Sequence, residues 1–157
     1  MTTKADFTEQ EWDAVLEGPP SAGMLIVTAS KGGTFRETFA IGKAYAEARQ
    51  QHGASELLDE IVAAKPEVDH TRYHSVEELK QHALQHVRDA IEVLQRKATP
   101  QEVEDYRKFV LALAERVAHA HREDGMEVSG PEQAAIDEIS ASLGDSGDVS
   151  SAAESGP

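Results

Sequence analysis

The sequence predicts an all-α protein, a compact single domain of six or seven helices followed by a disordered C-terminal tail. The first observation is a repeated capping box, in which a Ser or Thr oxygen accepts the amide three residues on and the Glu there reaches back. Each box precedes apolar residues at helical spacing, and no stretch alternates apolar and polar residues as strands do. The five boxes are Thr8/Glu11, Thr34/Glu37, Ser75/Glu78, Thr99/Glu102 and Ser129/Glu132.

Glycine and proline set the ends of the predicted helices. The first helix is expected to end at Gly18, Pro19 and Pro20, because proline removes a helical hydrogen bond. The segment that follows is almost entirely apolar and should be the most buried. Gly53 stops the third helix, and Pro100 suits the first position of the sixth. The expected helices are residues 9–17, 21–30, 35–51, 56–64, 76–97, 100–122 and 130–143.

Apolar stripes show which face of the two longest helices should enter the core. Residues at three- and four-residue spacing lie on one side of a helix. The stripe of the fifth helix is Val76, Leu79, Ala83, Val87, Ala90, Ile91 and Leu94, and that of the sixth is Val103, Tyr106, Val110, Leu113, Val117 and Ala120.

The ends of the chain are predicted to differ from its body. Residues 1–5 are expected to be a flexible N-terminus, and residues 6–143 the helical domain. Residues 144–157 hold one β-branched apolar residue and no aromatic residue, so they cannot bury enough surface to offset their ordering entropy. They are predicted to be a disordered acidic tail, and residues 65–74 a long polar connector.

Composition excludes several function classes. The 157 residues include 15 basic and 29 acidic side chains, for a net charge of −14, and no cysteine. This charge argues against nucleic-acid binding and against docking on an anionic membrane. Without cysteine there is no disulfide framework, thiolate metal site or cysteine nucleophile. No segment has the roughly 20 apolar residues of a membrane span, and no secretory signal is present, so the expected location is the cytoplasm.

The histidines are the first candidates for chemistry. A ladder at intervals of four would allow neighbouring side chains to share a metal ion. Ser75 is the expected helix cap, which leaves His82 and His86 on the helix with Glu78 as a third ligand. A complete site needs a second helix, where Glu115 and His119 have the same spacing. Two other interpretations stay open: partly exposed histidines without a role, or a pH-sensitive contact with a neighbouring helix. The ladder is His70, His74, Glu78, His82 and His86.

Other motifs give weaker signals. Residues 30–34 (Ser-Lys-Gly-Gly-Thr) precede a helix, but their order does not match a phosphate loop. A glycine turn that leads into a cap explains them, and successive amides there could hold an anion incidentally. No serine stands in a nucleophile elbow. No motif for an organic cofactor is found, so a divalent metal is the one candidate cofactor.

Residues 117–144 carry a distant family resemblance. A helix ends at Asp124-Gly125, and Val128-Ser129 lead into a helix with Glu132 that ends at Leu-Gly. This arrangement resembles the helix–turn–helix unit of the tellurite-resistance TerB-like family, which is all-helical. The resemblance implies metal binding by acidic turn residues, here Asp124 and Glu132. One extra residue separates Gly125 from Val128, and the earlier segment at residues 29–37 lacks the Asp that a second half-site would need.

Two functional hypotheses follow from the sequence. The first is a non-enzymatic cytoplasmic protein that acts through protein contacts, with a stress-related, TerB-like role. The alternative is a metal-binding helical protein or metalloenzyme that uses His82, His86, Glu115 and His119. A homodimer is a third arrangement that the sequence leaves open.

Overall fold

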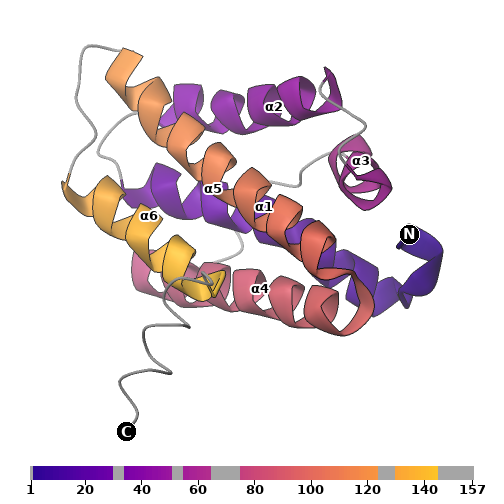
Figure 1. Cartoon of the computed structure of the whole chain (residues 1–157). Coiled ribbons are helices and arrows are strands. Elements are labelled where there is room, and N and C mark those ends of the chain that lie inside the picture. Colours follow the sequence, from indigo (N-terminus) through magenta and orange to yellow (C-terminus); the bar gives the residue numbers. More distant parts are fainter. Residues whose placement is uncertain (1, 30–33, 51–54, 65–74, 124–129, 145–157) are drawn as a thin grey trace, which may run out of the picture.

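The computed structural model describes residues 2–29, 34–50, 55–64, 75–123 and 130–144, with the backbone alone at 34–39, 76 and 121–123. These residues form helices and no strand, which confirms the all-α fold (Figure 1). Residues 145–157 of the predicted tail, the connector at 65–74 and the turns at 30–33 and 124–129 lie outside the described residues. The elements are the 3₁₀ helix η1 (Lys4–Asp6) and the α-helices α1 (Glu9–Ala29), α2 (Thr34–Gln50), α3 (Glu56–Ala63), α4 (Val76–Lys97), α5 (Pro100–Glu123) and α6 (Gly130–Ser142).

The break expected at Gly18, Pro19 and Pro20 is wrong, because α1 continues through them without interruption. Pro19 has no N–H to donate to the carbonyl of Val15, which would be its helical partner. The hydroxyl of Tyr106 on α5 donates to that carbonyl instead, over 2.8 Å. A donor from a distant part of the chain thus replaces the hydrogen bond that Pro19 removes.

Gly18 makes this contact between α1 and α5 possible. A Cβ atom on Gly18 would overlap the hydroxyl oxygen of Tyr106 and lie 3.2 Å from the Cβ of Ala90. Burial raises the pKa of the Tyr106 phenol well above its usual value, and nearby Tyr45 raises it further. The phenol therefore stays protonated, as a donor to the Val15 carbonyl requires.

The core is arranged around α1, which packs against α2, α4, α5 and α6. Figure 1 shows α5 crossing in front of α1, with α2 on one side and α4 on the other. The apolar segment Ala22–Val27 is fully buried, as the sequence predicts. None of the described helices combines the length and the hydropathy that a membrane-spanning segment requires.

Several of the predicted capping boxes are confirmed. Thr8 and Glu11 exchange both hydrogen bonds, at 2.9 and 3.1 Å, and Thr99 and Glu102 do so at 2.9 and 3.2 Å. At Ser75 the hydroxyl accepts the Glu78 amide over 3.0 Å, as expected of the helix cap. The Thr34 side chain and Ser129 lie outside the described residues. Local capping chemistry therefore places the helix starts correctly.

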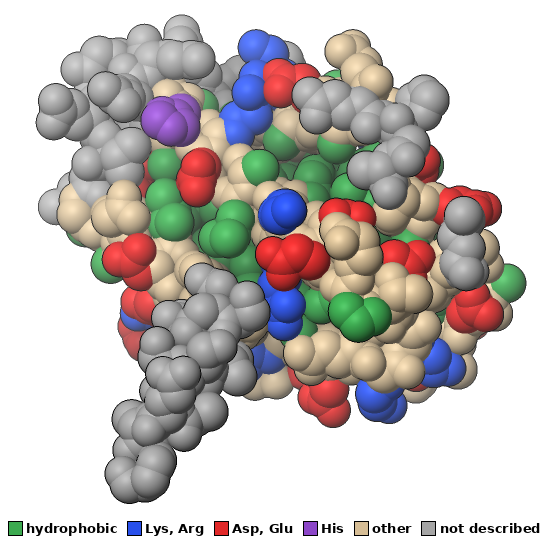
Figure 2. Space-filling model, viewed as in Figure 1, with side chains coloured by type: hydrophobic (Ala, Val, Ile, Leu, Met, Phe, Trp, Pro, Cys, Tyr) green, Lys and Arg blue, Asp and Glu red, His purple; other side chains and the backbone are tan. Residues whose placement is uncertain are grey.

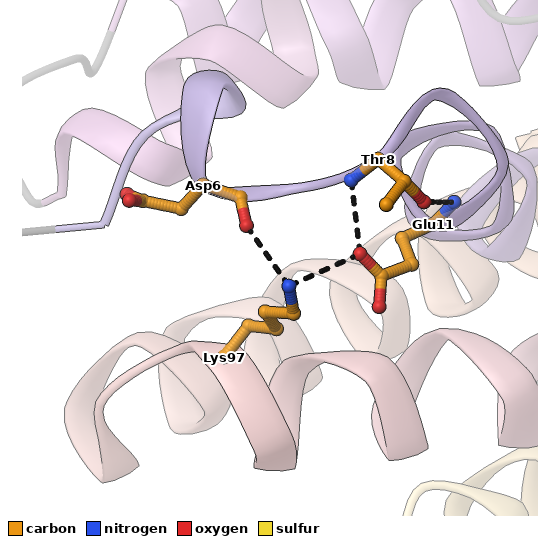
Figure 3. Close-up of polar contacts among 4 residues, drawn as sticks. All are labelled: Asp6, Thr8, Glu11 and Lys97. Carbon is orange, nitrogen blue, oxygen red and sulfur yellow. Dashed lines mark hydrogen bonds and ion pairs between the residues drawn. The ribbon is translucent and has the colours of Figure 1, made fainter.

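The N-terminal segment packs against the helical body, although residues 1–5 were expected to be flexible. The Thr2 amide donates to the buried carboxylate of Glu102, and the Lys4 amide lies 3.3 Å from a Glu60 oxygen. Figure 3 shows Lys97 of α4 bonded to both the Asp6 carbonyl and the Glu11 carboxylate, at 3.2 and 3.3 Å. These long-range contacts hold the segment in place, and no local sequence signal indicates them.

Glu102 should make stability depend on pH. Burial raises the pKa of its carboxyl, but the hydrogen bonds from Thr2 and Thr99 outweigh burial and hold the pKa below 4.5. A lowered pKa in the folded state contributes stability above pH of about 4.5, which is lost as pH falls through the folded value. Glu102→Gln should cost about 1–2 kcal/mol at pH 7, and the difference from wild type should shrink toward pH 3.

Denaturant unfolding at both pH values measures this difference. The matched control is Glu92→Gln, because Glu92 is exposed on α4. The control should match wild type within about 0.5 kcal/mol at either pH. A Glu102→Gln deficit of equal size at pH 7 and pH 3 would contradict the proposed role of the carboxylate charge.

Two arginines cap the C-terminal ends of α3 and α6, which have no basic residue in their own last turns. Arg49 of α2 donates to the Val62 carbonyl of α3 over 2.7 Å. Arg107 of α5 donates to the Leu143 carbonyl, just after α6, also over 2.7 Å. A cation at a helix C-terminus both satisfies a free carbonyl and offsets the helix dipole. Both short helices are thus completed by side chains from longer ones.

Candidate functional site

His86 forms a contact between α4 and α1. Its Nδ1 lies 3.0 Å from the Ser21 hydroxyl, and its Nε2 lies 3.9 Å from a Glu17 carboxylate oxygen. The His86 side chain is 18% exposed, at the edge of the buried face of α4. His82 is exposed one turn earlier, with its ring centroid 6.4 Å from that of His86. Of the interpretations drawn from the sequence, contact with a neighbouring helix matches His86 best.

The other predicted metal ligands are placed elsewhere. Glu115 and His119 are exposed on α5, whereas His86 faces α1. Among the described residues, no group of three or more His, Asp or Glu side chains could hold one metal ion. Metal binding by His82, His86, Glu115 and His119 therefore stays a prediction, with no ready-made ligand set in this part of the chain.

The two acids from the family resemblance have different outcomes. Glu132 is fully buried as the third residue of α6, the position that a capping-box acid occupies. Asp124 lies outside the described residues, as do its neighbours in the turn. The described structure therefore supports a position for Glu132 in the first turn of α6, and it does not test the turn as a metal site.

A groove between α2, α3 and α5 is a candidate site that the described residues line. Its volume is about 450 Å³, within the usual range of binding pockets. Its floor is mostly apolar and its rim is charged. The lining residues are Ala44, Glu47 and Ala48 from α2, Leu58 from α3, and Asp105, Lys108, Phe109, Ala112, Leu113 and Arg116 from α5. Figure 2 shows hydrophobic side chains in a hollow between α2 and α5, with acidic and basic side chains around it.

The floor of the groove rests on packed aromatic rings. Phe109 meets Tyr45 edge to face, with ring centroids 5.3 Å apart and an interplanar angle of 79°. Burial raises the pKa of the Tyr45 phenol, and the charge of Arg49 opposes this rise only weakly. The phenol is therefore neutral at ordinary pH. The floor is therefore an uncharged surface that is suited to apolar groups.

The rim carries both signs of charge. Arg116 of α5 and Glu47 of α2 form an ion pair, and both side chains are well exposed. Asp105 accepts a hydrogen bond from Gln101 over 3.0 Å, and Lys108 is exposed nearby. Exposed ion pairs of this kind contribute only about 0–1 kcal/mol, so an incoming group could rearrange the Glu47–Arg116 pair at little cost.

Sequence reasoning missed this groove because its residues give no motif. Its floor combines alanines and larger apolar residues that also fit an ordinary core stripe. The available signal is the four-residue spacing of Ala44 and Ala48, together with Ala112 on another helix. These alanines form a groove only because α2 and α5 lie next to each other, and the sequence does not show which helices are neighbours.

The arrangement of the groove has the parts of a binding site, with an apolar floor and polar groups at the rim. It holds no adjacent nucleophile and base, and the described residues around it form no metal-ligand cluster. Compared with known proteins, the chain matches no family model, no curated protein and no solved structure.

Proposed function

We propose that this protein is a non-enzymatic helical module that acts through contact with a protein partner, and that the groove between α2, α3 and α5 is the contact site. The observation that carries the proposal is the composition of this groove. Protein interfaces have an apolar centre inside a polar rim. The groove supplies both on one face, with Ala48, Leu58 and Ala112 as its accessible apolar residues and Lys108 and Arg116 at the rim.

The burial pattern of the chain supports the same proposal. Most large apolar side chains are fully enclosed between the helices. At the groove, in contrast, Leu58 is only partly buried, and Ala112 is exposed. Accessible apolar residues in a hollow with a charged rim have the arrangement of an interface, which supports the proposal.

The resemblance of residues 117–144 to the TerB-like family extends this proposal. It suggests that the contacts serve a stress response in the cytoplasm. This part of the proposal rests on the resemblance alone, because Asp124 and its turn lie outside the described residues. The groove does not depend on it, since none of its lining residues falls after Arg116.

Site-specific photo-crosslinking tests the contact site in the full chain. A photoreactive phenylalanine analogue replaces Ala112 in the groove, and a control chain carries it at Ala46, which is exposed on α2 outside the groove. In cells of the source organism, Ala112 should give discrete protein adducts, and Ala46 should not. Purified partner should then bind wild type at least about tenfold more tightly than Ala48→Trp. Equal adducts at both positions would contradict the proposal.

A further inference from the structure

Two consecutive prolines weaken the middle of α1. Pro19 and Pro20 have no N–H to donate, although both lie inside the helix. The carbonyls four residues earlier, those of Val15 and Leu16, therefore lose the donors that a helix normally supplies. One helical turn spans about 3.6 residues, so the two missing bonds are about half of those that cross this turn. Helices bend most readily at prolines, so residues 15–20 have the properties of a hinge.

The two halves of α1 pack against different neighbours. The half after the hinge is held in the core, where a Cβ on Gly23 would lie within 3.0 Å of Ile41 of α2 and Leu113 of α5. The half before the hinge lies along the end of α4, where the Glu11 carboxylate pairs with Lys97 over 3.3 Å. The first half can therefore move without breaking the contacts that hold Gly23.

The segment that precedes α1 belongs to this first half. The ring of Phe7 contacts that of Trp12 in α1, with centroids 5.6 Å apart. Further toward the N-terminus, the Thr2 amide donates to Glu102 of α5 over 3.1 Å. Figure 1 shows this end of the chain beside the junction of α4 and α5. Residues 2–17 thus form one unit that lies over this junction.

Two side chains from other helices hold this unit at its two ends. At the hinge, the Tyr106 hydroxyl donates to the Val15 carbonyl over 2.8 Å. At the other end, the Lys97 ammonium contacts the Asp6 carbonyl over 3.2 Å and also pairs with Glu11 (Figure 3). Both sets of contacts must break when the unit moves away from α4 and α5.

We propose that residues 2–17 are a lid that swings on the hinge at residues 15–20, with Tyr106 as its latch at the hinge and Lys97 as its latch at the other end. The lid opens within the folded protein, while residues 21–29 stay packed in the core. Proteins commonly open in such contiguous units at a lower free energy than global unfolding requires.

Opening of the lid changes what the protein exposes. Trp12 and Val15 lie on the inner face of the lid and are buried when it is closed. Both become accessible when it opens. This movement is separate from the proposed contact function, because no residue that lines the groove precedes Ala44.

Native-state hydrogen exchange of the full chain tests the lid. Amides of residues 12–17 should exchange at least about tenfold faster than those of residues 21–29, because opening exposes only the first half of α1. Lys97→Met should speed exchange at residues 12–17 by about threefold or more, because a latch is lost. The matched control is Lys80→Met on the same helix, which removes an ion pair with Glu138 of α6 and should leave residues 12–17 unchanged.

A variant outside the lid distinguishes a hinge from a rigid helix. Ile41→Val weakens the packing around Gly23, so it should speed exchange at residues 21–29 by about twofold or more. It should leave residues 12–17 unchanged, because the lid opens without breaking this contact. Equal acceleration of both segments would overturn the lid, because α1 would then move as one body.

Thiol labelling gives an independent measurement, because the chain has no cysteine of its own. Val15→Cys and Ala22→Cys each place one thiol at a completely buried position, one in the lid and one beyond the hinge. The thiol at position 15 should react at least about tenfold faster than that at position 22. Equal labelling rates would overturn the lid, and unchanged exchange at residues 12–17 in Lys97→Met would overturn the role of Lys97 as a latch.

Discussion

Replacing Gly18 with alanine is expected to lower the free energy of unfolding by about 2–4 kcal/mol. The new Cβ would overlap the Tyr106 hydroxyl oxygen and lie 3.2 Å from the Cβ of Ala90. Tyr106 cannot turn aside, because it is completely buried and its hydroxyl is bonded to the Val15 carbonyl. Either the phenol moves and loses that bond, or α1 moves away from α5. Urea unfolding measures the loss.

A double-mutant cycle identifies the source of this loss. Tyr106→Phe alone should cost about 1–3 kcal/mol, because the Val15 carbonyl beside Pro19 loses its phenol donor. In the Tyr106→Phe background, Gly18→Ala should cost at least about 1 kcal/mol less than in wild type, because the overlapping oxygen is gone. Strictly additive losses would show that the hydroxyl contact is not the reason for glycine at position 18.

Gly42 supplies the matched control for glycine itself. It also lies inside a helix, α2, but a Cβ there would meet nothing within 4 Å. Alanine favours helical backbone over glycine by about 0.5–1 kcal/mol, so Gly42→Ala should stabilise the protein by that amount. The opposite signs at Gly18 and Gly42 would separate the effect of packing from that of backbone entropy.

Gly23→Ala is expected to cost about 1–3 kcal/mol, the second-largest effect. Gly23 lies where α1 meets both α2 and α5. A Cβ there would lie 2.8 Å from two side-chain carbons of Ile41 and 3.0 Å from Leu113. All three residues are buried, so the neighbours have little room to move. The helices themselves would have to shift.

A compensating substitution tests the geometry at Gly23. Ile41→Val removes Cδ1, one of the two nearest carbons, and should itself cost about 0.5–1.5 kcal/mol. In the Ile41→Val background, the added cost of Gly23→Ala should fall by about 1 kcal/mol. Thermal unfolding of the four chains completes the cycle. An unchanged cost of Gly23→Ala would instead locate the conflict at the carbons that remain, Cγ1 of residue 41 and the Leu113 side chain.

The break predicted in α1 was wrong because the sequence indicates local contacts but not long-range ones. Capping boxes depend on residues three positions apart, so Thr8 and Thr99 could be assigned correctly from the sequence. Helix continuation through Pro19 depends on Tyr106, which is 91 positions from Val15, and no local rule finds such a donor. The contacts of the N-terminal segment are long-range in the same way, because Thr2 donates to Glu102 across a similar distance.

For the candidate sites too, spacing along one helix could be predicted, but contacts between helices could not. The sequence left open a contact between His86 and a neighbouring helix, but it could not name Ser21 as the partner. The histidine ladder suggested a metal, although sharing an ion with Glu115 or His119 requires helices that face each other. The groove depends on how α2, α3 and α5 pack together, so no property of any one of these helices predicts it.

The bond from Arg49 to the Val62 carbonyl has a consequence for how the groove moves. α3 has eight residues, too few to stay helical alone, so it is held by packing and by this side chain from α2. Leu58 of α3 lines one end of the groove. Unfolding of α3 would open that end of the groove, and it would also expose Leu57, Ile61 and Val62 of the core. A partner that contacts Leu58 should slow amide hydrogen exchange in α3 by a factor that its binding free energy sets. The exchange rate in α3 would then report on occupancy of the groove.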